Sequence, residues 1–123
     1  MGSQAQALRV RAKQFAIRAL RFVRSLPHDT ASDAVARQLA KSAPSVSANY
    51  HSAGRARSRN EFIARLGVVV DEADESVHWL TVIRDSGVAA GKELEWLIGE
   101  SSELRAIFSA SLSTARRNHR GKR

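Results

Sequence analysis

The sequence predicts an all-α protein built as an up-down-up-down four-helix bundle, and three observations support that prediction. Apolar residues recur at helical spacing through four long segments, and no segment shows the two-residue alternation of a strand. Only two prolines and seven glycines interrupt the 123 residues. Short links between long helices favour an antiparallel bundle, because each helix then packs beside the one that precedes it.

The first predicted helix covers residues 8–26 and ends at Pro27, which cannot continue a helix. Its charged residues lie on or beyond the edges of a single apolar arc. The residues of that arc are Leu8, Ala12, Phe15, Ala16, Ala19, Leu20, Phe22, Val23 and Leu26.

The second predicted helix begins where Thr30-Ala31-Ser32-Asp33 resembles a capping box, with Asp in place of the usual Glu or Gln. It runs to about Gly54. Pro44 falls inside it and is expected to kink the helix rather than end it, because the apolar pattern continues beyond the proline. The inward residues are Val35, Leu39, Val46 and Tyr50.

The capping box Ser58-Arg59-Asn60-Glu61 opens the third predicted helix, and Gly87 is the natural residue to follow its end. The fourth predicted helix covers residues 90–118. The inward residues of the third helix are Phe62, Leu66, Val69, Val70, Ala73, Val77, Leu80 and Ile83. Those of the fourth are Leu94, Leu97, Ile98, Leu104, Phe108, Leu112 and Ala115.

The length of the chain predicts one domain. We expect residues 8–118 to form the bundle, residues 1–7 to be disordered or a remnant of cloning, and residues 119–123 to be a basic tail. The absence of cysteine excludes disulfides, thiol nucleophiles and cysteine-based metal sites. The longest strictly hydrophobic run is Val68-Val69-Val70, far short of a membrane span, so a cytoplasmic protein is expected.

The net charge of +8 is concentrated at the two ends of the chain, whereas residues 60–86 are acidic. Such asymmetry favours a polyanionic partner bound through its phosphates. The candidate nucleic-acid-binding residues are Arg9, Lys13, Arg18, Arg21, Arg24, Arg55, Arg57, Arg59, Arg116, Arg117 and Arg120. The alternative is that the charges serve solubility, self-assembly and docking of a protein partner. An anionic membrane surface is disfavoured, because the apolar face of the first helix is needed for the core.

A second, smaller set of apolar residues lies outside the predicted core. These residues stand on secondary stripes of three helices, and two of them are tryptophans, which are enriched at subunit interfaces. Single exposed apolar residues are otherwise ordinary. The candidate oligomer interface consists of Val10, Ile17, Val68, Glu72, Glu75, Trp79, Trp96 and Ile107.

No motif in the sequence predicts catalysis. Glu75 and His78 form one Glu-x-x-His half-motif where a di-iron bundle needs two, and residues 87–93 lack the spacing and hydroxyl of a phosphate loop. The acidic residues 71–75 are most simply a solvated face. We therefore expect a non-enzymatic protein without metal or cofactor.

Four stretches of the sequence resemble the bacterial four helix bundle protein family, also called the 23S ribosomal RNA intervening-sequence protein or S23 family. They are Arg37-Gln38-Leu39, residues 42–50, residues 55–63, and residues 72–75 followed by Trp79-Leu80. The resemblance spans residues 8–118. It implies a bundle protomer in a homopentameric ring with a basic surface that binds nucleic acid. Among relatives associated with diversity-generating retroelements, the implied partner is a reverse transcriptase with its RNA.

Overall fold

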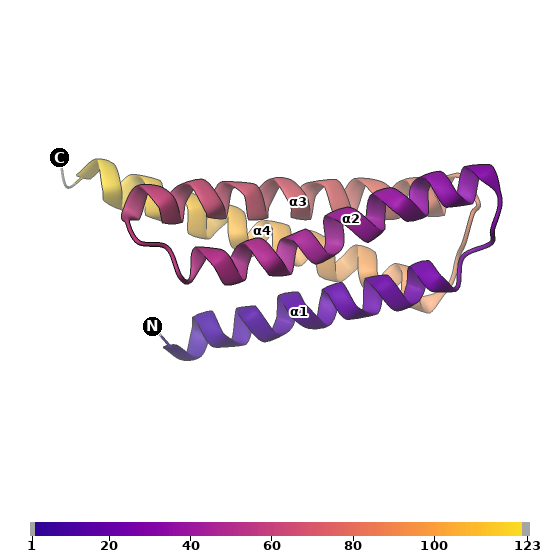
Figure 1. The fold of residues 1–123 in the computed structure, drawn as a ribbon, viewed down its shortest axis with the longest axis horizontal. Helices are drawn as coiled ribbons and strands as arrows, with labels where there is room; N and C mark the ends of the chain where they lie inside the picture. The colour runs from indigo at the N-terminus through magenta and orange to yellow at the C-terminus, as the bar shows by residue number, and fades with distance from the viewer. Residues whose placement is uncertain (1, 122–123) are drawn as a thin grey trace.

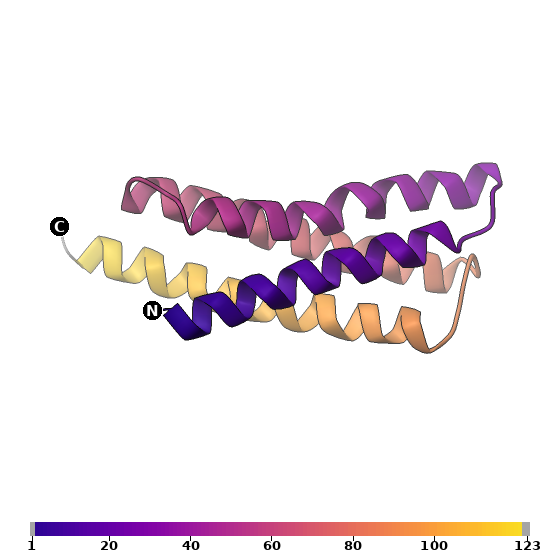
Figure 2. The ribbon, with the colours of Figure 1, turned by 60° about the horizontal axis from the view of Figure 1, so that its bottom comes forward.

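The structure is a computed structural model that describes residues 2–121, with the side chains of residues 4–121. It contains four helices: α1 (Gly2–Arg24), α2 (Thr30–Ala53), α3 (Arg59–Asp85) and α4 (Lys92–Gly121). Successive helices run in opposite directions, so both chain ends lie beside the α2–α3 connection at one end of the bundle (Figure 1; Figure 2). The predicted all-α, up-down-up-down architecture is confirmed.

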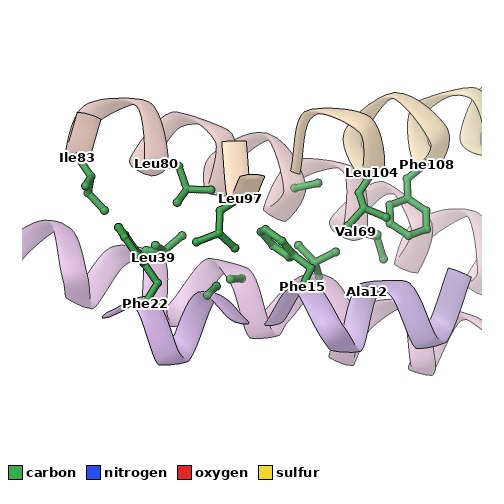
Figure 3. Packing of buried hydrophobic residues seen from close by; sticks show 14 of the residues in the cluster. Ala12, Phe15, Phe22, Leu39, Val69, Leu80, Ile83, Leu97, Leu104 and Phe108 are labelled. Atoms are coloured by element: carbon green, nitrogen blue, oxygen red, sulfur yellow. The ribbon is translucent and has the colours of Figure 1, made fainter. Parts of the chain in front are cut away.

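Each helix packs against two neighbours, in the cyclic order α1, α2, α3, α4. The contact between α1 and α4 is the sparsest, and α1 and α3 occupy opposite corners. The centre is filled by leucine and phenylalanine, as Figure 3 shows for Phe15, Leu39, Leu97 and Phe108. Across the core, the Tyr50 and Phe108 rings lie 4.8 Å apart between their centroids.

The helix boundaries differ from the predicted ones at both chain ends. α1 begins at Gly2, so residues 2–7, which we expected to be disordered, are helical. Ala5, Gln6 and Ala7 are good helix formers with no breaker among them, which accounts for the extension. α4 likewise continues to Gly121 and includes most of the expected tail, whereas residues 122–123 lie outside the described part of the chain.

Local signals explain the other helix ends. Ser58 caps α3 as predicted, its hydroxyl accepting from the Glu61 amide at 3.0 Å. The cap of α2 is Asp29 rather than the predicted Thr30: its carboxylate accepts from the Ser32 amide at 2.8 Å. Gly87 has a φ of 79°, and the Val88 amide donates to the Ile83 carbonyl, which forms a Schellman ending to α3.

Two features of the interior were not predicted. Leu20, predicted to belong to the core, is exposed, because it lies about 100° around the helix from the centre of the buried face. Buried serines occupy the contact between α2 and α3, where the Ser76 hydroxyl donates to Ser42 Oγ at 3.0 Å. α2 passes through Pro44 without ending, as expected.

Candidate nucleic-acid interface

The helix order brings three separate basic segments to one end of the bundle. The start of α1, the α2–α3 connection and the end of α4 all lie there (Figure 1). Gln4, Arg59 and Asn118 line one shallow hollow, and the Arg9 guanidinium lies against Gly54. We call this surface the basic end; it comprises Arg9, Arg55, Arg57, Arg59, Arg116, Arg117 and Arg120.

The basic end is poorly neutralised by the protein itself. Arg57 lies 3.6 Å from the Glu61 carboxylate, which also faces Arg65 at 3.9 Å. Within residues 4–121, the other members of the basic end form no ion pair. Their guanidinium groups therefore remain available to an external anion.

On α4, two members of the basic end lie one helical turn apart. Arg116 and Arg120 line a hollow of about 470 Å³ beside α3, together with the serines Ser109 and Ser113. Two guanidinium groups and two hydroxyls along one face offer several donors to phosphate oxygens. This face is suited to successive phosphates of a strand.

The remaining predicted nucleic-acid residues lie elsewhere. Lys13 lines a groove of about 690 Å³ between α1 and α2. Arg21 and Arg24 belong to the far end of α1, in its last turn. The eleven residues proposed from the sequence therefore do not form a single surface.

Arg18 is already engaged within the protein. Its guanidinium donates to both carboxylate oxygens of Glu93, at 3.0 and 2.6 Å, and lies 3.5 Å from the centroid of the Trp96 ring. A bidentate ion pair and an aromatic face leave this guanidinium fewer free donors for a phosphate than the unpaired arginines have. Arg18 joins α1 to α4 in this structure, and its part in nucleic-acid binding stays a prediction.

Arg11, which the sequence reasoning left out, reinforces the same contact. It donates to Glu100 through two nitrogens, at 2.8 and 2.9 Å, and also pairs with Glu103. We call these two arginines with Glu93, Glu100 and Glu103 the ionic clasp. Because α1 and α4 share few other contacts, the clasp is the main polar connection between them. The hydrogen bonds that Arg11 donates to Glu100 and Glu103 raise the pKa of Arg11, and the hydrogen bond from Arg18 lowers the pKa of Glu93.

The Glu93→Gln variant is expected to lose a pH-dependent part of the stability. Because the pKa of Glu93 is lowered on folding, its contribution is present above the ordinary value of 4.5 and is lost as the pH falls through the lowered one. Near neutral pH the wild type should therefore unfold at a higher urea concentration than the variant. The difference should close as the pH falls below the ordinary value and through the lowered pKa of Glu93. Urea titrations followed by circular dichroism measure it, and a difference independent of pH would contradict the role of the clasp.

The candidate oligomer residues differ in their surroundings. Val10, Ile17 and Val68 are exposed, whereas Glu72, Trp79, Trp96 and Ile107 are half-buried. Glu75 accepts from the Trp79 indole at 3.4 Å. The Trp96 ring is covered by Arg18 of the same chain, which accounts for this tryptophan without a neighbouring subunit.

The described residues contain no group of three or more His, Cys, Asp and Glu side chains arranged to hold a metal ion. His78 is exposed and packs edge-on against Trp79, with ring centroids 4.8 Å apart. Across residues 2–121, none of the helices has both the length and the apolar character needed to cross a membrane.

Comparison with known proteins agrees with the fold. Residues 6–110 match the family described as 23S rRNA-intervening sequence protein. A crystal structure of a protein with unknown function from the S23 ribosomal protein family of Bacteroides thetaiotaomicron VPI-5482 superimposes with a TM-score of 0.81. The two chains are 22% identical, and the alignment covers 89% of this chain and 97% of the other. No match is found among curated proteins.

The family match includes most of the bundle and the basic α2–α3 connection, but it stops before the basic residues at the end of α4. The resemblance noted in the sequence is therefore confirmed over most of its length. Because the match extends through far more than half of the chain, this protein belongs to the 23S rRNA-intervening sequence protein family.

Proposed function

We propose that this protein is a non-enzymatic, homo-oligomeric bundle that binds RNA or DNA through the phosphate backbone at its basic end. The observation that supports the proposal is that three basic segments meet at the basic end. Within residues 4–121, the arginines that define the basic end form no ion pair, apart from Arg57. Arginine and lysine contacts to phosphates supply most of the affinity of sequence-independent binding.

The composition of the basic end favours binding without base readout. On α4, no Phe, Trp or Tyr follows Phe108, which is itself buried in the core. This part of α4 offers the imidazole of His119 but no series of rings on which successive bases could stack. Phosphate contacts carry little sequence information, so similar affinities for unrelated sequences are expected.

Salt dependence provides the direct test. For about six neutralised phosphates, the slope of log K against log salt should be roughly −4 to −5, depending on whether the ligand is single- or double-stranded. Fluorescence anisotropy with labelled RNA and DNA of mixed sequence, between about 50 and 200 mM salt, measures this slope. An absence of binding by the wild type at the low-salt end would refute the nucleic-acid proposal.

The second candidate function is a scaffold whose charges serve self-assembly and the docking of a protein partner. The exposed apolar residues Val10, Ile17 and Val68 favour it, because nucleic acid offers them no matching surface. The family resemblance adds a pentamer as the expected assembly and a reverse transcriptase as a candidate partner. On this reading, nucleic-acid titrations would remain at background while the protein still assembled.

A further inference from the structure

Two helices at opposite corners of the bundle each present a second stripe to solvent. The α1 stripe consists of Val10, Lys13, Ile17, Leu20 and Arg24. The α3 stripe consists of Val68, Glu72, Glu75, Trp79 and Val82. Both follow the alternating three- and four-residue spacing with which one helix packs along another. The other faces of the two helices supply most of the core, and Trp79 of the α3 stripe packs against the edge of that core.

The exposure of the apolar residues on these stripes is exceptional in this protein. Among the described residues, four large hydrophobic side chains are exposed: Val10 at 46%, Ile17 at 38%, Leu20 at 39% and Val68 at 41%. Three of them belong to the α1 stripe and the fourth to the α3 stripe. Exposed apolar side chains gathered in this way mark interaction surfaces rather than ordinary solvated faces.

The charges of the two stripes are opposite. Lys13 and Arg24 make no ion pair within residues 4–121, and neither does Glu72. Glu72 is half-buried, and burial together with the neighbouring Glu75 raises the pKa of its carboxyl. The charge of Lys41 favours the ionised carboxylate of Glu72, and a cation brought by another molecule would stabilise that form further.

The groove between α1 and α2 provides depth beside the α1 stripe. Val10 and Lys13 form part of one wall, while Pro44, Ala48 and His51 line the α2 side. The lining is mainly apolar with cationic groups at the edge. It therefore fits a helix that carries apolar and acidic side chains, which is the character of the α3 stripe.

From these observations we infer that the α1 stripe of one copy docks against the α3 stripe of the next copy. Since α1 and α3 lie at opposite corners, one copy can engage a neighbour on each side at the same time. Such a head-to-tail contact forms a ring if its rotation closes and a filament if it does not. A standard interface of about 800 Å² per partner is close to a tenth of the protomer surface of 7328 Å². The inference rests on the homo-oligomeric part of the proposed function and is independent of nucleic-acid binding.

Charge reversal tests the pairing. One variant carries Lys13→Glu with Arg24→Glu, and the other carries Glu72→Lys with Glu75→Lys. Each should remain folded, since these residues are exposed or half-buried, but each should weaken assembly about a hundred-fold, because like charges then face each other. A single variant that carries all four substitutions should assemble like the wild type, since every contact between its copies again pairs opposite charges, whatever the number of copies. Sedimentation velocity without nucleic acid measures assembly, and circular dichroism checks the fold.

The matched control for the first variant is Arg37→Glu with Lys92→Glu, which lowers the net charge by the same amount at exposed positions outside both stripes. It should assemble like the wild type. Two-residue variants that assemble normally, or a four-residue variant that does not recover, would overturn the inference while leaving the wild-type oligomer in place. A wild type that sediments as a 13.5 kDa monomer at micromolar concentration would overturn both the inference and the oligomeric part of the function. Anisotropy titrations would still decide nucleic-acid binding separately.

Discussion

Replacing Arg116, Arg117 and Arg120 by alanine is expected to lower the affinity for nucleic acid on the order of a thousand-fold at about 50 mM salt. Each lost phosphate contact removes one released counterion, which is worth roughly tenfold at that salt concentration. The slope of log K against log salt should flatten to about −2 for the same reason. All sequences should be affected alike, since these contacts do not read bases. Fluorescence anisotropy over a salt series gives both quantities.

The matched control for that experiment removes three positive charges away from the basic end. Arg37, Lys41 and Lys92 are exposed, and none of them forms an ion pair within residues 4–121. Their replacement by alanine should leave most of the affinity intact. An equal loss of affinity in the control would show that binding follows net charge. That result would contradict the assignment of the basic end as the nucleic-acid interface.

Replacing Phe108 by alanine should lower the free energy of unfolding by about 3–5 kcal/mol. The Phe108 ring is fully buried and packs against Tyr50 across the core, so its removal leaves a cavity that four helices cannot easily close. Urea denaturation followed by circular dichroism measures the change. Phe108→Leu retains most of the apolar volume and should recover most of the loss. If the alanine variant unfolds within about 1 kcal/mol of the wild type, the core has relaxed around the gap and the packing described above is not rigid.

The architecture was predictable because its determinants are local and repeated. The 3.6-residue period of the apolar residues survives in every helix, and the signals at Ser58 and Gly87 act through backbone groups within a few residues. The capping-box pattern of residues 30–33 predicts Thr30 as the cap of α2, whereas the structure uses Asp29. Both residues are good caps, and only the backbone geometry selects between them.

The binding surface was only partly predictable, because a sequence shows which residues are charged but not which of them are already paired. Arg18 and Arg21 look alike in the sequence, yet Glu93 and Trp96 hold the first and the second is exposed. The burial of Ser42 and Ser76 has no signal in the sequence, because isolated serines usually face water. The meeting of the three basic segments follows from the antiparallel topology, once each segment is placed at a helix end.

The antiparallel order also determines the electric field of the molecule. Helix dipoles that alternate in direction cancel in pairs, so the lengthwise field arises almost entirely from charged side chains. A polyanion should therefore orient the approaching bundle so that its basic end faces the polyanion. In that orientation the flanks that carry the α1 and α3 stripes stay clear of the strand. Copies joined through their α1 and α3 stripes would then present several basic ends to the same strand. Their combined avidity for that strand would exceed the affinity of one copy.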